Sequence, residues 1–437
     1  MLYHRWLRVA RQQGRMTALR DLATSQEWTF EQLRAAAETS SPPASGVHCP
    51  SGARAEFILQ VLRAWRRGVI VAPLEDGQDP PPLADDPAPL ALLKSAFPLC
   101  AHLKTTSATT GRPRLIAFSE SQLAADAEQI VATMGLRPEW PNLGVISMAH
   151  SYGFSNLVLP LLLHGIPLIL GQSALPESVS RAGVGAEALT LPAVPALWRA
   201  WHEARAIPAT VRLAISAGAP LPVALEQQVF AASGLKIHNF YGSSECGGIA
   251  FDATESPRAE GAGAGVPMRG VELNCDDEGC LEVRSRAAGL GYWPEASPDL
   301  GDGFFRTNDL AELKGGWVHL RGRRSDLINV AGRKVAPETI ESALLAHEAV
   351  RECVVLGLPD PGGAREETIA VCVVPRRAVG TEDLRQFLLR QLPAWQVPRH
   401  WRTLDALPVN GRGKVPRVQL RRIFNVDTGP RQKNMPG

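Results

Sequence analysis

The chain has 437 residues, of which 45% are hydrophobic and 21% are charged. A chain of this length can bury a large core, and at about 150 residues per domain it predicts two or three domains. The formal net charge is only +2, from 46 basic and 44 acidic residues, which gives no case for nucleic acid or an anionic membrane surface as a partner.

Neither the N-terminal stretch nor the longest apolar run predicts an export signal or a transmembrane segment. Residues 1–16 carry charges throughout and have no apolar core of the kind that a secretory signal needs. The run from Leu157 to Leu170 is too short to span a bilayer and contains two prolines and a histidine, so we expect a buried strand and turn. The seven cysteines are scattered without a CxxC pair, which favours reduced thiols and a cytoplasmic protein.

The chain up to about residue 265 predicts helices and strands in alternation. Residues 51–73 place apolar side chains at helical spacing before a short β-rich run, and residues 75–90 are rich in proline and aspartate, which predicts a loop. This alternation favours an α/β domain with layered sheets. The further strands that we expect cover residues 115–118, 144–148, 167–170 and 212–215, and the helices cover residues 121–134 and 221–232.

The pattern changes near residue 265, where short strands with turn signals predict a small β-rich unit. After Arg323 a compact block predicts an α+β domain of about 100 residues, and the polar tail is expected to be disordered. The expected elements are strands at 271–274, 279–284, 316–321, 350–357 and 367–374, and helices at 337–346 and 381–392. The expected divisions are a large N-terminal domain (1–324, with the β-rich subdomain at about 265–322), a C-terminal domain (325–424) and a tail (425–437).

Residues 105–114 form the first chemical motif, which reads TTSATTGRPR. Its hydroxyls and backbone N–H groups can surround anionic oxygens while the arginines supply positive charge. The spacing GxxxxGK[ST] is absent, so this is not a Walker loop. Considered alone, the motif is equally compatible with an ordinary polar turn.

Residues 239–245 form a second motif, NFYGSSE, in which an aromatic side chain and a glycine precede two hydroxyls and a carboxylate. Such a segment can stack on a base and hold a metal ion. The alternative is a strand followed by a helix that is capped by Ser243 or Ser244.

Two later motifs complete the set. RTND ends at Asp309 and is followed by Arg323, and this carboxylate and guanidinium can bind ribose hydroxyls. PVNGRGK ends at Lys414, where a glycine-rich turn presents a mobile cation that suits charge stabilisation during phosphoryl transfer. Each of the two is also compatible with a surface loop.

In this order and with these gaps, the four motifs resemble those of the adenylate-forming enzymes. That superfamily includes acyl-CoA synthetases, adenylation domains of peptide synthetases and firefly-type luciferases. The resemblance extends from about residue 50 to about residue 424. It implies an α/β fold in which a large N-terminal domain of layered sheets and helices, with a small β-rich subdomain, precedes a small mobile α+β domain.

The resemblance also implies a role for each motif residue. Ser244 contacts the α-phosphate of ATP, Glu245 binds Mg²⁺, and Lys414 contacts the acyl carboxylate and the α-phosphate. Gly218 and Ala219 lie beside the adenine and the acid. The residues implied for the β- and γ-phosphates are Thr106, Ser107, Thr109, Thr110, Gly111 and Arg114, and those implied for the nucleoside are Tyr241, Gly242, Asp309 and Arg323.

The implied reaction is ATP-dependent activation of a fatty or aromatic acid to an acyl-adenylate, followed by transfer to a thiol, with coenzyme A as the expected acceptor. His150 lies in an HSYG segment that resembles the one beside the acid pocket of acyl- and aryl-CoA synthetases, and this form favours a fatty acid. No aspartate occurs between Asp126 and Asp252, which argues against an amino acid. Rotation of the C-terminal domain about Ser325 is implied between the two steps.

Several positions depart from the pattern of the superfamily. The phosphate loop usually reads TSGTTGxPK, whereas Ala108 replaces a glycine and Arg114 replaces the lysine. Asn308 and Ala331 also stand where glycine is common, and the N-terminal region is short. Two alternatives therefore stay open: an enzyme that loads the phosphopantetheine arm of a carrier protein, and a degenerate nucleotide-binding relative without catalysis.

Overall fold

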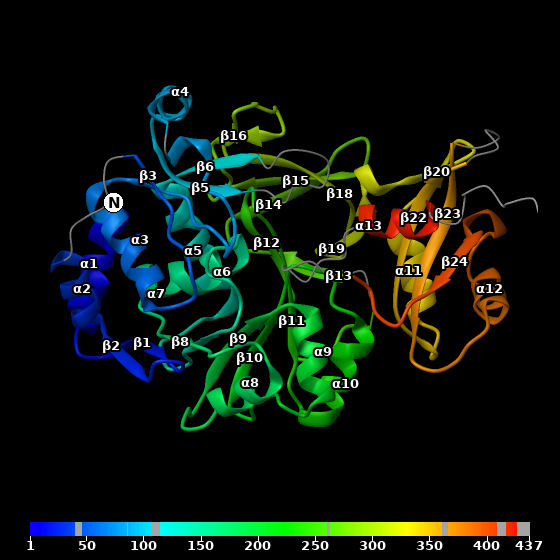
Figure 1. Cartoon of the computed structure of the whole chain (residues 1–437), viewed down its shortest axis with the longest axis horizontal. Coiled ribbons are helices and arrows are strands. Elements are labelled where there is room, and N and C mark those ends of the chain that lie inside the picture. Colours follow the sequence, from blue (N-terminus) through cyan, green and yellow to red (C-terminus); the bar gives the residue numbers. More distant parts are fainter. Residues whose placement is uncertain are drawn as a thin grey trace, which may run out of the picture. The chain divides into compact units, whose positions relative to one another are not determined.

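The computed structural model describes residues 1–39, 46–84, 86–105, 114–259, 263–360, 366–408 and 417–425. The described chain divides into two compact units (Figure 1). The first unit comprises Met1–Asp276, Leu281–Thr307 and Leu313–His319, and the second comprises Asp277–Cys280, Asn308–Glu312 and the chain from Leu320. Both contain sheets and helices, so the predicted α/β class, with a large sheet-rich part and a smaller C-terminal part, is confirmed.

The N-terminal segment of the first unit begins with an amphipathic helix. Helix α1 (Leu2–Gln13) buries Leu2, Trp6, Val9 and Ala10, which recur at helical spacing along one face. It is followed by β1 (Thr17–Asp21), β2 (Gln26–Thr29) and α2 (Phe30–Thr39). Strand β1 pairs in parallel with β8 (Leu168–Leu170), so this segment joins the central sheet.

The central sheet has a parallel core. Its order in the first unit is β13-β12-β11-β10-β9-β7-β8-β1-β2, and the strands from β11 to β1 in this order run parallel. Parallel strands place their carboxyl ends at one edge, where loops meet. The bounds are β7 (Asn142–Gly144), β9 (Leu189–Ala193), β10 (Val211–Ser216), β11 (Ile237–Ser243), β12 (Gly247–Phe251) and β13 (Gly263–Pro267), and the helices between them are α5 (Glu120–Met134), α8 (Pro176–Ala182), α9 (Pro195–Glu203) and α10 (Val223–Ser233).

A second sheet of the first unit has the order β16-β6-β5-β4-β3. Its strands are β3 (Val47–His48), β4 (Ile70–Val71), β5 (Cys100–Thr105), β6 (Leu115–Ser119) and β16 (Gly291–Trp293), with helix α3 (Ala55–Arg67) before β4. The loop predicted at 75–90 is wrong at its end, because a short 3₁₀ turn η1 (Pro82–Ala84) precedes helix α4 (Pro87–Ala96). Asp86 caps α4 by accepting the N–H of Ala88 at 2.9 Å.

The apolar run from Leu157 to Leu170 is mostly helical, so the predicted buried strand and turn are wrong for its first half. A helical segment comprises α6 (Ser151–Gly153), η2 (Phe154–Val158) and α7 (Leu159–His164), and only β8 matches the expectation. A uniformly apolar run has no period, so it cannot distinguish a buried helix from a buried strand. The strand expected at 144–148 is also displaced, because β7 ends at Gly144.

Three antiparallel strands after residue 265 lie close to their predicted positions: β14 (Val271–Cys275), β15 (Cys280–Ser285) and β19 (Trp317–Arg323). Strands β17 (Leu300–Gly301) and β18 (Phe304–Lys314) were not expected. Strands β14, β15, β18 and β19 are neighbours in this order in the sheet. The domain divisions at residues 324 and 425 stay predictions, and the tail after Asn425 lies outside the described residues.

The second unit contains a three-stranded sheet of order β22-β23-β24 and a separate hairpin, β20 with β21. The two helices and two strands predicted here are confirmed, whereas the hairpin, β24 and α13 were not expected. The bounds are η3 (Arg324–Asp326), β20 (Ile328–Val330), β21 (Arg333–Val335), α11 (Pro337–Leu345), β22 (Val350–Pro359), β23 (Glu367–Pro375), α12 (Thr381–Leu389), η4 (Ala394–Gln396), β24 (His400–Thr403) and α13 (Arg417–Asn425).

Two further features concern the described chain as a whole. All seven cysteines lie within the described ranges, and none of them forms a disulfide. Cys246, Cys280, Cys353 and Cys372 are buried. Every helix within these ranges is too short or too polar to cross a membrane.

Candidate active site

Two predicted motifs lie largely outside the described residues. These undescribed positions include Thr106, Ser107, Thr109, Thr110 and Gly111 of the phosphate loop, and Lys414. The two ends of the phosphate loop are described, because Thr105 of β5 pairs with Leu115 of β6 in an antiparallel register. The loop therefore connects the ends of two adjacent strands. Arg114 is the residue immediately before Leu115, at the start of β6.

The NFYGSSE segment forms a hairpin, so the predicted alternative of a strand followed by a capped helix is wrong. Strand β11 carries Tyr241 and Gly242 and pairs antiparallel with β12 across a turn that contains Ser244 and Glu245. The hydroxyl of Ser243 closes the turn by accepting the N–H of Glu245 at 3.2 Å. A side chain at Gly242 would place its Cβ 2.6 Å from the carbonyl oxygen of Gly247, so the hairpin requires glycine here.

The HSYG segment lies against this turn. Ser151 donates a hydrogen bond from its hydroxyl to the hydroxyl of Ser244 at 3.0 Å. His150 is half-buried and directly precedes the helical segment that begins at Ser151. The predicted acid-site histidine and the predicted α-phosphate serine therefore belong to neighbouring pieces of backbone in the same unit.

Tyr152 is a candidate site residue that the sequence analysis did not identify. Its hydroxyl lies 3.4 Å from the carbonyl oxygens of both Ala193 and Ile215, at the carboxyl ends of β9 and β10. Its ring lies 5.9 Å from the ring of Phe240 on β11. Burial raises the pKa of Tyr152, so the hydroxyl stays protonated and donates. Gly218, with φ of +84°, follows β10 at the same sheet edge.

Glu245 and Arg114 meet the same aromatic side chain. The hydroxyl of Tyr292 donates to Oε1 of Glu245 at 3.2 Å, and the guanidinium of Arg114 lies 3.8 Å from the centre of the Tyr292 ring. Burial and the nearby Glu245 raise the pKa of Tyr292, which keeps its hydroxyl protonated as a donor. The structure thus brings together two residues that the sequence motifs identified separately.

A buried lysine lies beneath the hairpin turn. The Nζ of Lys104 lies 3.9 Å from Oδ2 of Asp126 and 4.5 Å from the centre of the Phe118 ring. Burial lowers the pKa of Lys104, and negative charge on Asp126 and Glu245 opposes that shift. Asp126 also accepts the hydroxyl of Ser155 at 2.6 Å. Neither Lys104 nor Asp126 belongs to a motif, so composition and spacing gave no signal for this pair.

Asp309 and Arg323, the two residues implied for the ribose, form an ion pair. The Nε of Arg323 lies 3.0 Å from Oδ1 of Asp309, and the side chain of Arg323 is 52% exposed. Both residues belong to the second unit. His150, Gly218, Tyr241 and Glu245 belong to the first unit.

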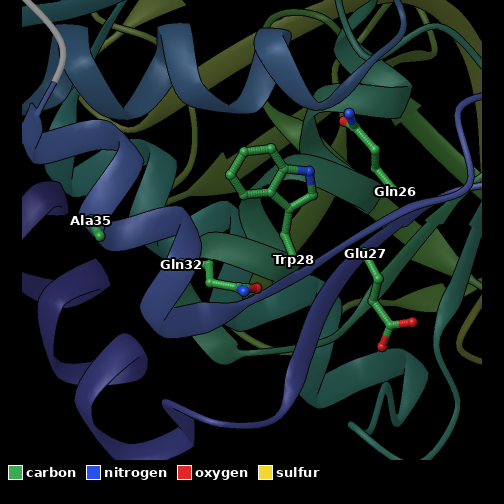
Figure 2. Close-up of a pocket in the computed structure, with 5 residues that line it drawn as sticks. All are labelled: Gln26, Glu27, Trp28, Gln32 and Ala35. Atoms are coloured by element: carbon green, nitrogen blue, oxygen red, sulfur yellow. The ribbon is translucent and has the colours of Figure 1, made fainter.

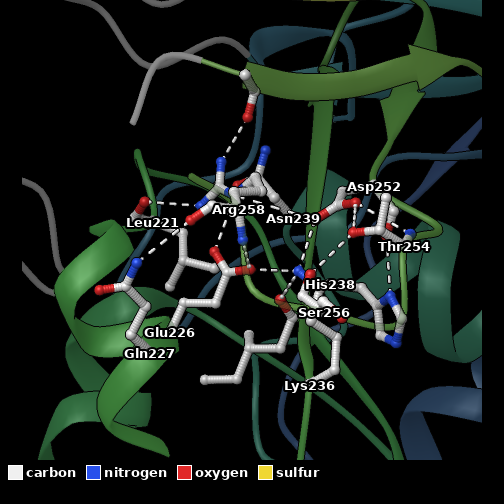
Figure 3. Close-up of polar contacts among 12 residues, drawn as sticks. Leu221, Glu226, Gln227, Lys236, His238, Asn239, Asp252, Thr254, Ser256 and Arg258 are labelled. Atoms are coloured by element: carbon white, nitrogen blue, oxygen red, sulfur yellow. Dashed lines mark hydrogen bonds and ion pairs between the residues drawn. The ribbon is translucent and has the colours of Figure 1, made fainter. Parts of the chain in front are cut away.

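A buried network of charged residues supports the hairpin (Figure 3). Lys236 donates to Oδ2 of Asp252 at 2.6 Å and also contacts Glu226. Arg258 donates from Nε to Oε2 of Glu226 at 2.8 Å and from Nη2 to the carbonyl oxygen of Leu221 at 2.9 Å. The network therefore ties α10 to the residues that flank the two hairpin strands, Lys236 before β11 and Asp252 after β12, and to the segment that follows Ala219.

A surface pocket lies elsewhere on the first unit. It is lined by Gln26, Glu27, Trp28, Gln32 and Ala35, from β2 and α2 (Figure 2). None of the residues predicted for the nucleotide or the acid lines it. The hairpin turn is therefore the better candidate for the active site.

Two family models of known proteins match this chain. Residues 100–293 match the family model of the AMP-binding enzyme, and residues 339–414 match that of the AMP-binding enzyme C-terminal domain. The structure is similar to that of ATP-bound MatB from Rhodopseudomonas palustris, with a TM-score of 0.83, 19% identity, and coverage of 97% of this chain and 99% of that one. This likeness concerns the fold.

Two relatives are similar in sequence over most of the chain. One is a probable 2-succinylbenzoate–CoA ligase from Mycobacterium tuberculosis, 31% identical over 74% of this chain and 84% of its own length. The other is a feruloyl-CoA synthase from Amycolatopsis, 28% identical over 74% of this chain and 69% of its own length. The family models, the relatives and the fold agree with the expected resemblance, and the chain belongs to the AMP-binding enzyme family.

Proposed function

We propose that this protein is an AMP-forming acid–thiol ligase, which activates a carboxylic acid with ATP and transfers the acyl group to coenzyme A. The observation that carries the proposal is a set of contacts within the first unit: Ser151 donates to Ser244, and Tyr292 contacts both Glu245 and Arg114. The names of the relatives, which are CoA ligases and synthases, support the same reaction.

The chemistry explains why these side chains are needed. A carboxylate is a poor electrophile, because its oxide oxygen is not a leaving group. Attack of that oxygen on the α-phosphorus of ATP forms an oxygen–phosphorus bond and releases pyrophosphate, and attack of a thiol on the resulting anhydride releases AMP. The first step brings two anions together, so positive charge must be held at the phosphates.

We assign that charge to Arg114, Lys414 and Mg²⁺. The carboxylate of Glu245 is the kind of oxygen ligand that Mg²⁺ takes together with substrate phosphates. When bound, Mg²⁺ would supply positive charge at the departing pyrophosphate. The phosphate loop of residues 106–114 completes this part of the proposed site.

The remaining roles in the proposal concern the rest of ATP and the acid. We assign the adenine to Tyr241, Gly242 and the Gly218–Ala219 segment, the α-phosphate to Ser244, and the ribose to Asp309 and Arg323. His150 lies beside the acid in this proposal. The named acids of the two relatives are aromatic, whereas the HSYG form favours a fatty acid, so both classes remain candidates.

The acceptor can be tested directly. The phosphopantetheine arm of a carrier protein presents the same thiol as coenzyme A, and transfer to such a carrier is the alternative to be distinguished. A cytoplasmic location, which supplies ATP and coenzyme A and keeps thiols reduced, is part of the proposal.

The decisive measurement is acid-dependent exchange of labelled pyrophosphate into ATP across fatty, aromatic and amino acids. We expect exchange with at least one fatty or aromatic acid, and thioester formation once coenzyme A is added. Lys414→Ala should reduce exchange at least a hundredfold, because it removes charge that is needed in the transition state. Its ATP binding should change much less. ATP binding without exchange, for every acid, would instead identify a degenerate relative.

A further inference from the structure

We propose that Tyr292 is a positioning residue, which holds Glu245 and Arg114 in the arrangement that the phosphates of magnesium–ATP require. This inference rests on the proposed function and extends it to a residue outside the four motifs. Tyr292 lies on β16 and is only 8% exposed. It contacts both residues, through different parts of its side chain.

The hydroxyl acts on Glu245. It donates to Oε1 of the carboxylate at 3.2 Å, and Glu245 lies in the turn between β11 and β12. A glutamate side chain loses rotamer freedom when it is fixed, which opposes metal binding. The hydrogen bond from Tyr292 fixes this side chain before the metal binds, so part of the lost freedom is not lost again on binding. The metal then binds a carboxylate that is already oriented.

The ring acts on Arg114. The guanidinium lies 3.8 Å from the ring centre, and Nη2 donates to the carbonyl oxygen of Glu295 at 3.4 Å. A planar guanidinium can stack on an aromatic face and still direct N–H groups along its edges, whereas a lysine ammonium is a point charge without a face. Tyr292 therefore gives a physical reason for arginine at the position where the superfamily has lysine.

The backbone fixes Tyr292 between the two residues. On one side, β16 pairs antiparallel with β6, so Tyr292 lies opposite Ile116. This places it close to Arg114, which immediately precedes β6. On the other side, the N–H of Gly289 donates to the carbonyl oxygen of Glu245 at 2.8 Å. A Cβ at Gly289 would lie 2.8 Å from Cγ2 of Ile116, so only glycine allows this close approach. The segment thus links the hairpin turn to the end of the phosphate loop.

The first test separates the hydroxyl from the ring. Tyr292→Phe keeps the stacking surface and removes the donor to Glu245. We expect the dissociation constant of Mn²⁺ in the presence of ATP, measured by electron paramagnetic resonance, to rise about three- to tenfold, the range for one lost hydrogen bond. The half-saturating Mg²⁺ concentration in pyrophosphate exchange should rise equally, while the rate at saturating Mg²⁺ stays within about twofold. Tyr3→Phe, on α1, is the matched control and should leave both quantities unchanged.

The second test addresses the ring. Arg114→Lys should weaken ATP binding in the wild-type background, and it should add little when Tyr292→Leu has already removed the stacking face. Additive effects of Arg114→Lys and Tyr292→Leu would overturn the part of the proposal that concerns Arg114.

The outcomes separate this inference from the proposed function. If Tyr292→Phe binds Mn²⁺ with ATP as tightly as wild type, the inference is wrong. It is also wrong if the substitution lowers thermal stability and leaves Mn²⁺ binding unchanged. If wild type shows no pyrophosphate exchange with any acid, the proposed function fails, yet the Mn²⁺ measurement still decides whether Tyr292 orients Glu245.

Discussion

Ala331 has a backbone conformation that alanine tolerates poorly. In the turn between β20 and β21, Ala331 has φ of +54° and Gly332 has φ of +81°, and the pair joins Val330 to Arg333 as a two-residue hairpin loop. Two successive positive φ values define the turn type that prefers Asn-Gly. Ala331 is exposed, so it is free of packing constraints. We predict that Ala331→Asn raises the free energy of unfolding of the second unit by about 1 kcal/mol.

Urea denaturation measures this change, and the neighbouring residue provides the control. Gly332→Ala introduces a Cβ at φ of +81°, although nothing lies within 4 Å of it, so its cost comes from the backbone alone. It should lower the free energy of unfolding by about 1 kcal/mol. Equal stability of wild type and Ala331→Asn would show that this turn adopts another conformation in solution.

Single residues of the site differ in how far the sequence can identify them. Glu245 and Arg114 stand in motifs whose order carries chemical meaning, so they can be named from the sequence, although their roles stay predictions. Tyr292 and Lys104 acquire their importance only from what they contact after folding. No local sequence feature shows that a tyrosine or a lysine in a strand will contact a buried residue far away in the sequence.

Among the elements, the buried network behind the hairpin has the clearest consequence for ATP. Glu226 of α10 is fully buried and holds Lys236 and Arg258, and Arg258 in turn holds the carbonyl oxygen of Leu221. We predict that Glu226→Gln lowers the free energy of unfolding by about 2–4 kcal/mol, because two buried cations lose a charged partner. The dissociation constant of ATP should rise as well, since the segment after Ala219 loses its anchor.

Thermal unfolding and ATP titration of the same variant test both effects. Glu203→Gln provides the control, because Glu203 is exposed at the end of α9 and should change stability by less than about 0.5 kcal/mol. A Glu226→Gln protein with unchanged ATP affinity but lower stability would confine the network to a structural role.

The prediction of elements succeeded where the pattern had a period and failed where it had none. Helix α5 has apolar residues at helical spacing, and strand β10 is a short apolar run with β-branched residues that is bounded by turns. Both lie within a few residues of their expected places. The run from Leu157 is apolar at nearly every position because the helix is buried on all sides. Its helical form is decided by packing against α1 and α5 rather than by local sequence.

At the scale of the whole molecule, the two units should respond to pH in opposite directions. His164, on α7 of the first unit, lies beside Arg5 and Glu128, and burial lowers its pKa to about 4. The unfolded chain then binds a proton below about pH 6.5 that the folded unit does not bind. The first unit should therefore lose about 1 kcal/mol, after allowance for solvent screening, as pH falls from 6.5 to 4.

Glu341, on α11 of the second unit, has the opposite effect. Burial raises its pKa to about 7, although Arg417 opposes the shift, so the folded unit keeps a proton that the unfolded chain has released. The second unit should therefore lose about 1–3 kcal/mol as pH rises from 4.5 through 7. Glu341→Gln should remove this loss, because an amide oxygen can still accept the N–H of Val355.

Scanning calorimetry between pH 4.5 and 8 tests the prediction of opposite responses. The transition of the second unit should move to lower temperature as pH rises, and that of the first unit as pH falls. In His164→Asn, the transition temperature of the first unit should fall less at acid pH. In Glu341→Gln, the transition temperature of the second unit should fall less near neutral pH. Transitions that move together in both variants would contradict the assignment to separate units.

The state of the cysteines makes the chain suitable for site-directed fluorescent labelling. Burial raises the pKa of Cys100 to about 11 and that of Cys246 to about 12, and the thiolate is the form that reacts with a maleimide. Cys49, Cys100 and Cys275 are half-buried, and Cys49 and Cys275 are the first to replace with serine. One introduced surface cysteine in each unit could then carry a donor and an acceptor dye, and the distance between dyes would report whether ATP and coenzyme A favour different rotations about Ser325.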